Sequence, residues 1–215
     1  MNNHLQEQNW FNVLKPLGHI HSYEAETTLL FQGEPVPHVG IIISGMASAR
    51  AMSKDGKETW VNSFYPGDFF GHVSLISQSP IAFEIQAYRP VQALMIPVKR
   101  LQDLLGDNQE LSLALSQDLA RRLNLMTARL IEAVNVSSPG RVCAELLRLS
   151  KPIGVEPDKL IVRPAPVFVD LALRISATRE TVSRTVNSLQ KDGVLSREPG
   201  ALIINDLMAL EAKIK

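Results

Sequence analysis

A long uninterrupted helix in the middle of the chain constrains the fold more than any other feature of the sequence. No proline or glycine occurs between Gln109 and Val136, and helix-forming residues dominate the segment. Apolar residues recur there at alternating steps of four and three, the seam spacing of a coiled coil. We therefore predict a helix over residues 109–137 whose seam is buried by a second copy of the chain. Packing of the seam on the chain's own β domain is the alternative. The seam residues are Leu119, Leu123, Met126, Leu130 and Ala133.

The segment before this helix has the pattern of a small β domain. Short apolar runs occur between Thr28 and Pro97, and glycines at 33, 45, 56 and 67 separate them. Short strands at such spacing are typical of an antiparallel β sandwich or roll. The pair Asp55-Gly56 predicts a hairpin turn, because glycine accepts a positive φ. Residues 1–108 are assigned to a β-roll domain that begins with a short amphipathic helix, with Leu5, Trp10, Phe11 and Leu14 on its inner side.

The residues after the long helix predict a second domain. Ser137-Ser138-Pro139-Gly140 breaks the helix and reads as a hinge. Three helical segments follow, RVCAELLRLSK, VFVDLALRI and TRETVSRTVNSLQKDG, and Thr178 is the expected N-cap of the third. VLSREPGALIIN then has strand, turn and strand character. Helices joined by a short turn and followed by a β hairpin predict a winged helix-turn-helix over residues 138–215, and an α+β fold class overall.

Composition and motifs exclude several classes of protein. The single cysteine, Cys143, forms no internal disulfide, four-cysteine iron–sulfur cluster or Cys-rich zinc site, and its apolar neighbours predict a core position. The N-terminus lacks the pattern of a signal peptide, and no apolar stretch reaches the ~18 residues of a membrane span. The expected location is the cytoplasm. An enzyme is not expected, since the sequence contains no P-loop, G-x-S-x-G or H-E-x-x-H motif.

Charge is distributed unevenly along the chain. Lysine plus arginine equals aspartate plus glutamate at 22 each, yet the balance is −4 over residues 1–110, +1 over residues 111–138 and +3 over residues 139–215. This drift favours a polyanion as the partner of the C-terminal part. Ordinary surface charge is the alternative.

The start of the third C-terminal helix carries side chains suited to reading DNA. Glu180, Ser183 and Arg184 are spaced three and four apart and share one face with Arg179 nearby, whereas Val182, Val186 and Leu189 take the buried side. Arginine can bind guanine O6 and N7 in the major groove, and glutamate can accept from the cytosine amino group. The helix N-terminus with Thr178 or Thr181 can hold a phosphate. The alternative is a solvated helix with an internal ion pair.

The same residues carry a family resemblance that extends over nearly the whole chain. DLALRISATRETVSRTVNSLQKDGVL resembles the recognition signature of the CRP/FNR transcription regulators. FQGEPVPHVGIIISGMASA and YPGDFFGHVSLI resemble their β-roll, ARRL the start of their dimer helix, and PGRVCAELL their hinge. One departure is Ser176, where relatives usually have glycine in the turn; serine can adopt that conformation at some cost.

The resemblance implies a homodimer that binds double-stranded DNA at a two-fold operator and acts together with RNA polymerase. The base-reading positions of the family fall on Arg179, Glu180 and Arg184, as in the branch with a TGTGA-like half-site. Ser183 matches a base-contacting position of the FNR branch, so the outer bases of the half-site stay open.

The resemblance also locates a degenerate ligand cassette. Relatives that bind cyclic AMP have a Gly-Glu pair, then Arg followed by Ser or Thr, and a Thr-Ser pair on the dimer helix. The corresponding residues here are Gly71 and His72, then Ile81 and Ala82, then Met126 and Thr127. A phosphodiester against Ile81 and Ala82 would lack its counter-charge, which is costly. We therefore predict no cofactor and no control by cyclic AMP.

Three alternatives stay open for ligand control. The domain senses another small molecule, or it binds haem, or it has no ligand control. Haem has candidate ligands in the histidines, although no spacing among them marks a ligand pair. They are His4, His19, His21, His38 and His72.

Overall fold

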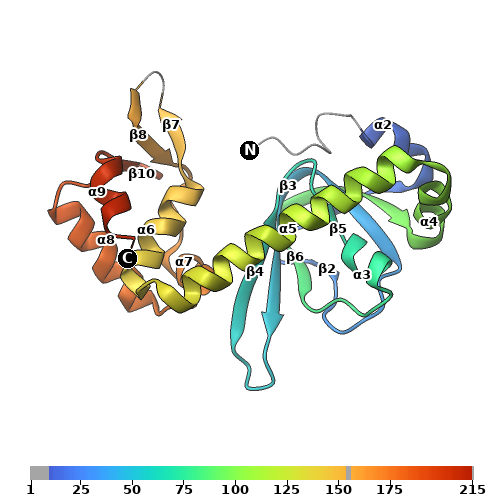
Figure 1. Cartoon of the computed structure of the whole chain (residues 1–215), viewed down its shortest axis with the longest axis horizontal. Coiled ribbons are helices and arrows are strands. Elements are labelled where there is room, and N and C mark those ends of the chain that lie inside the picture. Colours follow the sequence, from blue (N-terminus) through green and yellow to red (C-terminus); the bar gives the residue numbers. More distant parts are fainter. Residues whose placement is uncertain (1–9, 154–155, 215) are drawn as a thin grey trace. The chain divides into compact units, whose positions relative to one another are not determined.

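The computed structural model describes residues 10–153 and 156–214 of the 215-residue chain (Figure 1). The chain forms two compact units that meet within helix α5 (Gln109–Asn135), between Leu125 and Met126. The first unit contains an antiparallel sheet and the second a helix-turn-helix. The predicted α+β class and the order of sheet, long helix and helix-turn-helix are confirmed.

Antiparallel strands make up most of the first unit. Its sheet has the order β1-β6-β3-β4, with β2 paired to β6 and β5 paired to β3. The predicted hairpin joins β3 to β4, and Gly56 has a φ of +76° in its turn. An apolar interior lies among these strands and includes Ile42, Phe64, Phe70 and Ile85. The strands are β1 (His19–Tyr23), β2 (Thr28–Leu30), β3 (His38–Met52), β4 (Glu58–Phe64), β5 (Phe69–Phe70) and β6 (Glu84–Pro97).

Helices pack against the same sheet and form a second apolar cluster. Leu111 and Leu115 in the first turns of α5 are buried there with Phe69 and Leu94 of the sheet. Trp10 and Leu14 on the expected amphipathic helix are also buried in this cluster, whereas Leu5 lies outside the described residues. The remaining helices of the unit are α2 (Trp10–Leu14), the short 3₁₀ helix η1 (Lys15–Leu17), α3 (His72–Ser77) and α4 (Val98–Asp107).

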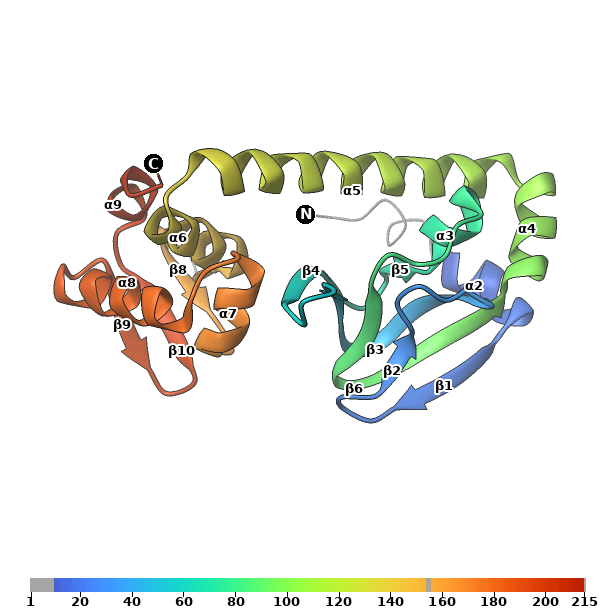
Figure 2. The ribbon, with the colours of Figure 1, turned by 90° about the horizontal axis from the view of Figure 1, so that it is seen from below.

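The second unit combines the predicted helices with a four-stranded sheet of order β7-β8-β10-β9. Figure 2 shows its helices α6 to α9 together with strands β8, β9 and β10. Its core draws on every helix after α5, and Cys143 is buried within it as expected. The elements are α6 (Ser138–Leu149), β7 (Lys151–Ile153), β8 (Glu156–Val162), α7 (Phe168–Arg174), α8 (Arg179–Lys191), β9 (Leu195–Glu198), β10 (Ala201–Ile204) and α9 (Leu207–Ala212).

Some elements differ from the sequence-based expectation. Helix α5 ends at Asn135, short of residue 137, because Ser137 is already the N-cap of α6 and its Oγ accepts from the Gly140 N–H at 3.2 Å. The break in the helix is thus where SSPG predicted it. Strands β7 and β8 and helices α3 and α9 were not anticipated.

Candidate nucleic-acid interface and ligand cassette

Helix α8 presents the predicted DNA-reading residues at its N-terminal end. Arg179, Glu180 and Arg184 are exposed, and with the half-buried Ser183 they line one open hollow on the surface. On the opposite side Val182, Val186 and Leu189 are buried in the core of the unit. The two faces follow from the 3.6-residue period of the helix, as the sequence predicted.

The predicted cap at Thr178 organises the first turn of α8. The Thr178 Oγ1 accepts from the Thr181 N–H at 3.2 Å, and its hydroxyl also lies 3.1 Å from that of Thr181. The Glu180 backbone N–H and the Thr178 hydroxyl hold the pKa of the exposed Glu180 carboxyl below its usual value. This end of the helix therefore carries a carboxylate between two arginines at neutral pH.

A tight turn fixes the start of α8 relative to α7. Ser176 has a φ of +50°, the left-handed conformation that glycine adopts most readily. The Ala177 N–H donates to the Ala172 carbonyl at 3.0 Å and the Ser176 N–H to the Leu173 carbonyl at 3.5 Å. This pair of bonds is a Schellman motif, which ends α7 and leads directly into the cap of α8. The expectation that serine tolerates this conformation is confirmed.

In the ligand cassette predicted for the first unit, Gly71 occupies a turn and the residue at the predicted cation position is apolar. Gly71 has a φ of +81° and precedes α3, so the backbone turn survives. Ile81 is only 4% exposed and packs among the apolar side chains of the roll. Its backbone N–H and carbonyl are bonded to Glu34 and Gly33 at 3.2 and 2.8 Å. Ala82 is exposed.

His72 belongs to a buried charged cluster that the sequence did not reveal. Its ring is 1% exposed, and Nε2 lies 3.2 Å from Asp118 Oδ2 on α5. Arg122 Nε donates to the same oxygen at 2.6 Å, and Arg121 Nη2 donates to Asp118 Oδ1 at 2.5 Å. Arg122 Nη2 also reaches the Phe69 carbonyl at 3.2 Å and lies 3.8 Å from Asp68. The cluster ties the cassette to the first half of α5.

Burial and pairing shift the pKa values of His72 and Asp118 in opposite directions. Burial lowers the pKa of His72 more than the neighbouring Asp118 raises it, so the imidazole is neutral at pH 7. Burial alone would raise the pKa of Asp118, but His72 and Arg122 together hold that pKa far below its usual range. Asp118 is therefore a buried carboxylate, and Arg122 is its principal counter-ion. The sequence indicated this ion pair only through the opposite charges of Asp118 and Arg122, which are four residues apart on a predicted helix.

The other two cassette residues, Met126 and Thr127, lie on α5 in the second unit. Met126 is half-buried and Thr127 is exposed. Within one chain, the seam residues Leu123 and Leu130 are 67% and 66% exposed. Ala133 is exposed as well, and Leu119 is half-buried. Leu123 is therefore left mostly uncovered by the first unit, to which it belongs, and Leu130 is left mostly uncovered by the second unit.

The candidate haem ligands are scattered over the first unit. His19 and His21 are exposed on β1, His38 is half-buried at the start of β3, and His72 contacts Asp118. His4 lies outside the described residues. No group of three or more His, Cys, Asp or Glu side chains in residues 10–153 and 156–214 is arranged to hold a metal ion. Over the same residues, no helix combines the length and apolar character that a membrane crossing requires.

Comparison with known families assigns one domain to each of the two units, and the matched ranges leave most of α5 between them. Residues 20–108 match the cyclic nucleotide-binding domain, and residues 140–213 match the Crp-like helix-turn-helix domain. A CRP-like cAMP-activated global transcriptional regulator of Mycobacterium tuberculosis is 29% identical over 180 residues, which cover 83% of this chain and 80% of the relative.

Solved structures share the fold over almost the full length. FixK2 from Bradyrhizobium japonicum superposes with a TM-score of 0.78 at 19% identity, over 91% of this chain and 96% of FixK2. The c-di-GMP responsive regulator CLP of Xanthomonas campestris superposes with a TM-score of 0.77 at 22% identity, over 92% of this chain and 98% of CLP. The order of β domain, long helix and helix-turn-helix is common to all three chains.

Proposed function

Because the chain belongs to the CRP/FNR family of DNA-binding transcription regulators, we propose that it acts as a homodimer on a two-fold operator and does so without cyclic AMP. The proposed half-site is TGTGA-like. RNA polymerase is proposed as the further partner, since a regulator bound at a promoter acts on transcription through it.

The arrangement at the start of α8 carries this proposal. Arg179, Glu180 and Arg184 project from a helix whose opposite face is held in the core, and the Ser176 turn and the Thr178 cap fix where that helix begins. An arginine offers two parallel donors to guanine, and the Glu180 carboxylate accepts from the amino group of cytosine. The N-terminal N–H groups of α8 favour a backbone phosphate nearby. Base reading and phosphate binding are thus available on one helix end.

The exposed seam on α5 supports the homodimer. Leu123 and Leu130 expose two thirds of their side chains, and they are separated by seven residues, as in a heptad repeat. Burying such side chains contributes roughly 1.5–3 kcal/mol each. A second α5 placed against the first would cover the seam of both chains, and the two-fold axis between them would match a two-fold operator.

The closed cassette supports independence from cyclic AMP. The M. tuberculosis relative is named as cAMP-activated, and the X. campestris regulator as c-di-GMP responsive. Here the side chain at the cation position, Ile81, is packed in the apolar interior, and His72 is engaged by Asp118. A phosphate brought to this place would be desolvated without a counter-charge, which costs several kcal/mol.

Selection of binding sites from random DNA tests the proposed function. Wild-type protein should select a two-fold sequence, and Glu180→Ala should lose preference at one base pair in each half-site, worth about 1–3 kcal/mol of discrimination. Glu211→Ala, on the exposed side of α9, is the matched control and should select the wild-type sequence. Affinity of all three proteins should fall as salt rises. An unchanged sequence preference for Glu180→Ala would contradict the assignment of α8 as the reading helix.

A further inference from the structure

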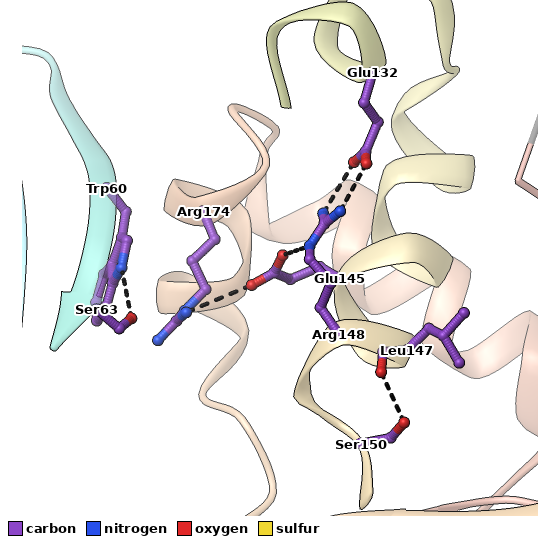
Figure 3. A network of polar contacts seen from close by, with 8 residues as sticks. All are labelled: Trp60, Ser63, Glu132, Glu145, Leu147, Arg148, Ser150 and Arg174. Carbon is purple, nitrogen blue, oxygen red and sulfur yellow. Dashed lines mark hydrogen bonds and ion pairs between the residues drawn. The ribbon is translucent and has the colours of Figure 1, made fainter. Parts of the chain in front are cut away.

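The last turns of α5 are bound to the DNA-binding unit by an ion pair of high geometric quality (Figure 3). Arg148 of α6 places Nη1 2.7 Å from Glu132 Oε2 and Nη2 3.0 Å from Glu132 Oε1. Two parallel bonds between a guanidinium and a carboxylate fix both distance and orientation. Glu132 belongs to the part of α5 beyond Leu125, so the contact lies wholly within the second unit.

The same arginine extends the contact into the core of the unit. Arg148 Nε donates to Glu145 Oε2 at 2.7 Å, and Arg174 of α7 reaches Glu145 Oε1 at 3.4 Å. The Glu145 side chain is 2% exposed and that of Arg174 is 10% exposed. Because Glu145 and Arg174 are shielded from water, salt screens their pair less than a surface pair, whereas the Arg148 side chain is 36% exposed. One continuous path of charges therefore connects α5, α6 and α7, and α7 leads into the recognition helix.

A second arginine, Arg141, forms hydrogen bonds around the break between α5 and α6. Arg141 Nη1 donates to the Val136 carbonyl at 2.7 Å, just beyond the end of α5, and Nη2 donates to Ser138 Oγ at 3.1 Å. Its Nε donates to the carbonyl of Ile175, next to the Ser176 turn, at 3.0 Å. A single guanidinium thus donates both to a carbonyl just beyond the end of α5 and to the carbonyl next to the turn before α8.

We infer that Glu132, Arg148 and Arg141 are positioning residues that fix the recognition helix to the last turns of α5. The described residues of the second unit, 126–153 and 156–214, then move as one body, and the break at residues 136–140 is not the hinge that its Ser-Ser-Pro-Gly sequence suggests. Glu145 and Arg174 relay this attachment to α7. The inference rests on the proposed function, namely that α5 forms the dimer and that α8 reads the operator.

The attachment has a consequence for operator choice. If each recognition helix is fixed to its own α5, the pairing of the two α5 helices sets the separation of the recognition helices. A change of one base pair between half-sites moves and rotates one half-site relative to the other by about a tenth of a turn. A dimer with rigidly attached recognition helices then binds tightly at only one spacing of the half-sites, whereas a dimer with loosely attached recognition helices binds at several spacings.

Distance measurement between two spin labels tests the rigidity directly. The labels are placed at Ala128→Cys on α5 and Asn187→Cys on α8, both exposed, and labelled chains are diluted with unlabelled ones so that only distances within a chain contribute. Cys143 is 1% exposed, and chains without the two new cysteines control for its labelling. A narrow distribution is expected for wild-type protein and for Glu110→Ala at the exposed start of α5. A broad one is expected for Glu132→Ala and for Arg148→Lys, which keeps the charge but loses the paired geometry.

Operator spacing provides the second readout. Wild-type protein should bind the selected operator about tenfold or more tightly than one with a base pair added between the half-sites. Glu132→Ala should reduce this ratio to about threefold or less while it remains dimeric. A broad wild-type distance distribution, or a Glu132→Ala protein that keeps both the narrow distribution and the wild-type ratio, would overturn the inference. A wild-type protein with a narrow distribution and no sequence preference would instead refute the proposed function alone.

Discussion

Replacing Asp118 by alanine should strongly destabilise the first unit, because it leaves a buried arginine without its counter-ion. The Asp118 side chain is fully buried and accepts from Arg122 at 2.6 Å and from Arg121 at 2.5 Å. Arg122 is only 13% exposed, so water cannot replace the lost carboxylate. The His72 ring would lose its partner as well.

The size of this loss of stability depends on the contacts that Arg122 and Arg121 keep once the carboxylate is removed. Removing one member of a buried ion pair costs about 3–5 kcal/mol. Arg122 keeps the Phe69 carbonyl at 3.2 Å and lies 3.8 Å from Asp68, which places the cost at the lower end of that range. Arg121 is 43% exposed, so its share of the loss is small. We expect Asp118→Ala to lower the free energy of unfolding of the first unit by about 3 kcal/mol.

Urea titration followed by tryptophan fluorescence measures this loss. Both tryptophans, Trp10 and Trp60, belong to the first unit, so their emission reports its unfolding. Protein concentration is held constant, since the proposed dimerisation would contribute to stability. Asp103→Ala is the control, because its pair with Lys99 is exposed and should be worth less than about 0.5 kcal/mol. A loss below about 1 kcal/mol for Asp118→Ala would refute the view that Arg122 depends on this carboxylate.

Three further predictions concern the cassette and the seam. Burial lowers the pKa of His72 in the folded protein, so His72 of the unfolded chain binds a proton first as pH falls below about 6.5. The first unit should then lose about 1.4 kcal/mol of stability per pH unit until the pH reaches the pKa of His72 in the folded state. His72→Gln should remove this slope from urea titrations between pH 7 and 5. In sedimentation at micromolar concentration, wild-type protein should be dimeric and the Leu123→Glu variant monomeric. Leu113 is exposed but lies off the seam, so the Leu113→Glu variant is the control and should remain dimeric. A monomeric wild-type protein would refute the proposed dimer. Calorimetry at neutral pH should detect no binding of cyclic AMP, and a micromolar dissociation constant coupled to tighter DNA binding would contradict our reading of the cassette.

The elements whose residues repeat with a local period could be predicted from the sequence. The seam of α5 and the two faces of α8 follow from helical spacing, and the hairpin at Gly56 follows from turn chemistry. The residues proposed to read DNA lie on one helix end, so their common face could also be predicted. Predicting the turn at Ser176 required only that serine can adopt a positive φ.

Features that depend on distant contacts could not be predicted in this way. Pro152 argues against a strand, yet β7 contains it, because β7 is an edge strand where a missing N–H is tolerated. His72 and Asp118 are far apart in the chain, and only the packing of α5 on the sheet brings them together. The same holds for Glu132 and Arg148, whose contact crosses the break that the sequence marks as a hinge. Local periodicity contains no information on such pairs.

The packing of Ile81 has a consequence for how regulators of this fold can change their ligands. A return to a phosphate-binding arginine at this position would place a cation among the side chains of the roll interior, where Ile81 is 4% exposed. An unpaired buried charge costs several kcal/mol, a large part of the 5–15 kcal/mol that holds an ordinary domain together. The neighbouring side chains would have to move apart to admit the guanidinium. A single Ile81→Arg substitution is therefore expected to destabilise the first unit rather than to create a phosphate site.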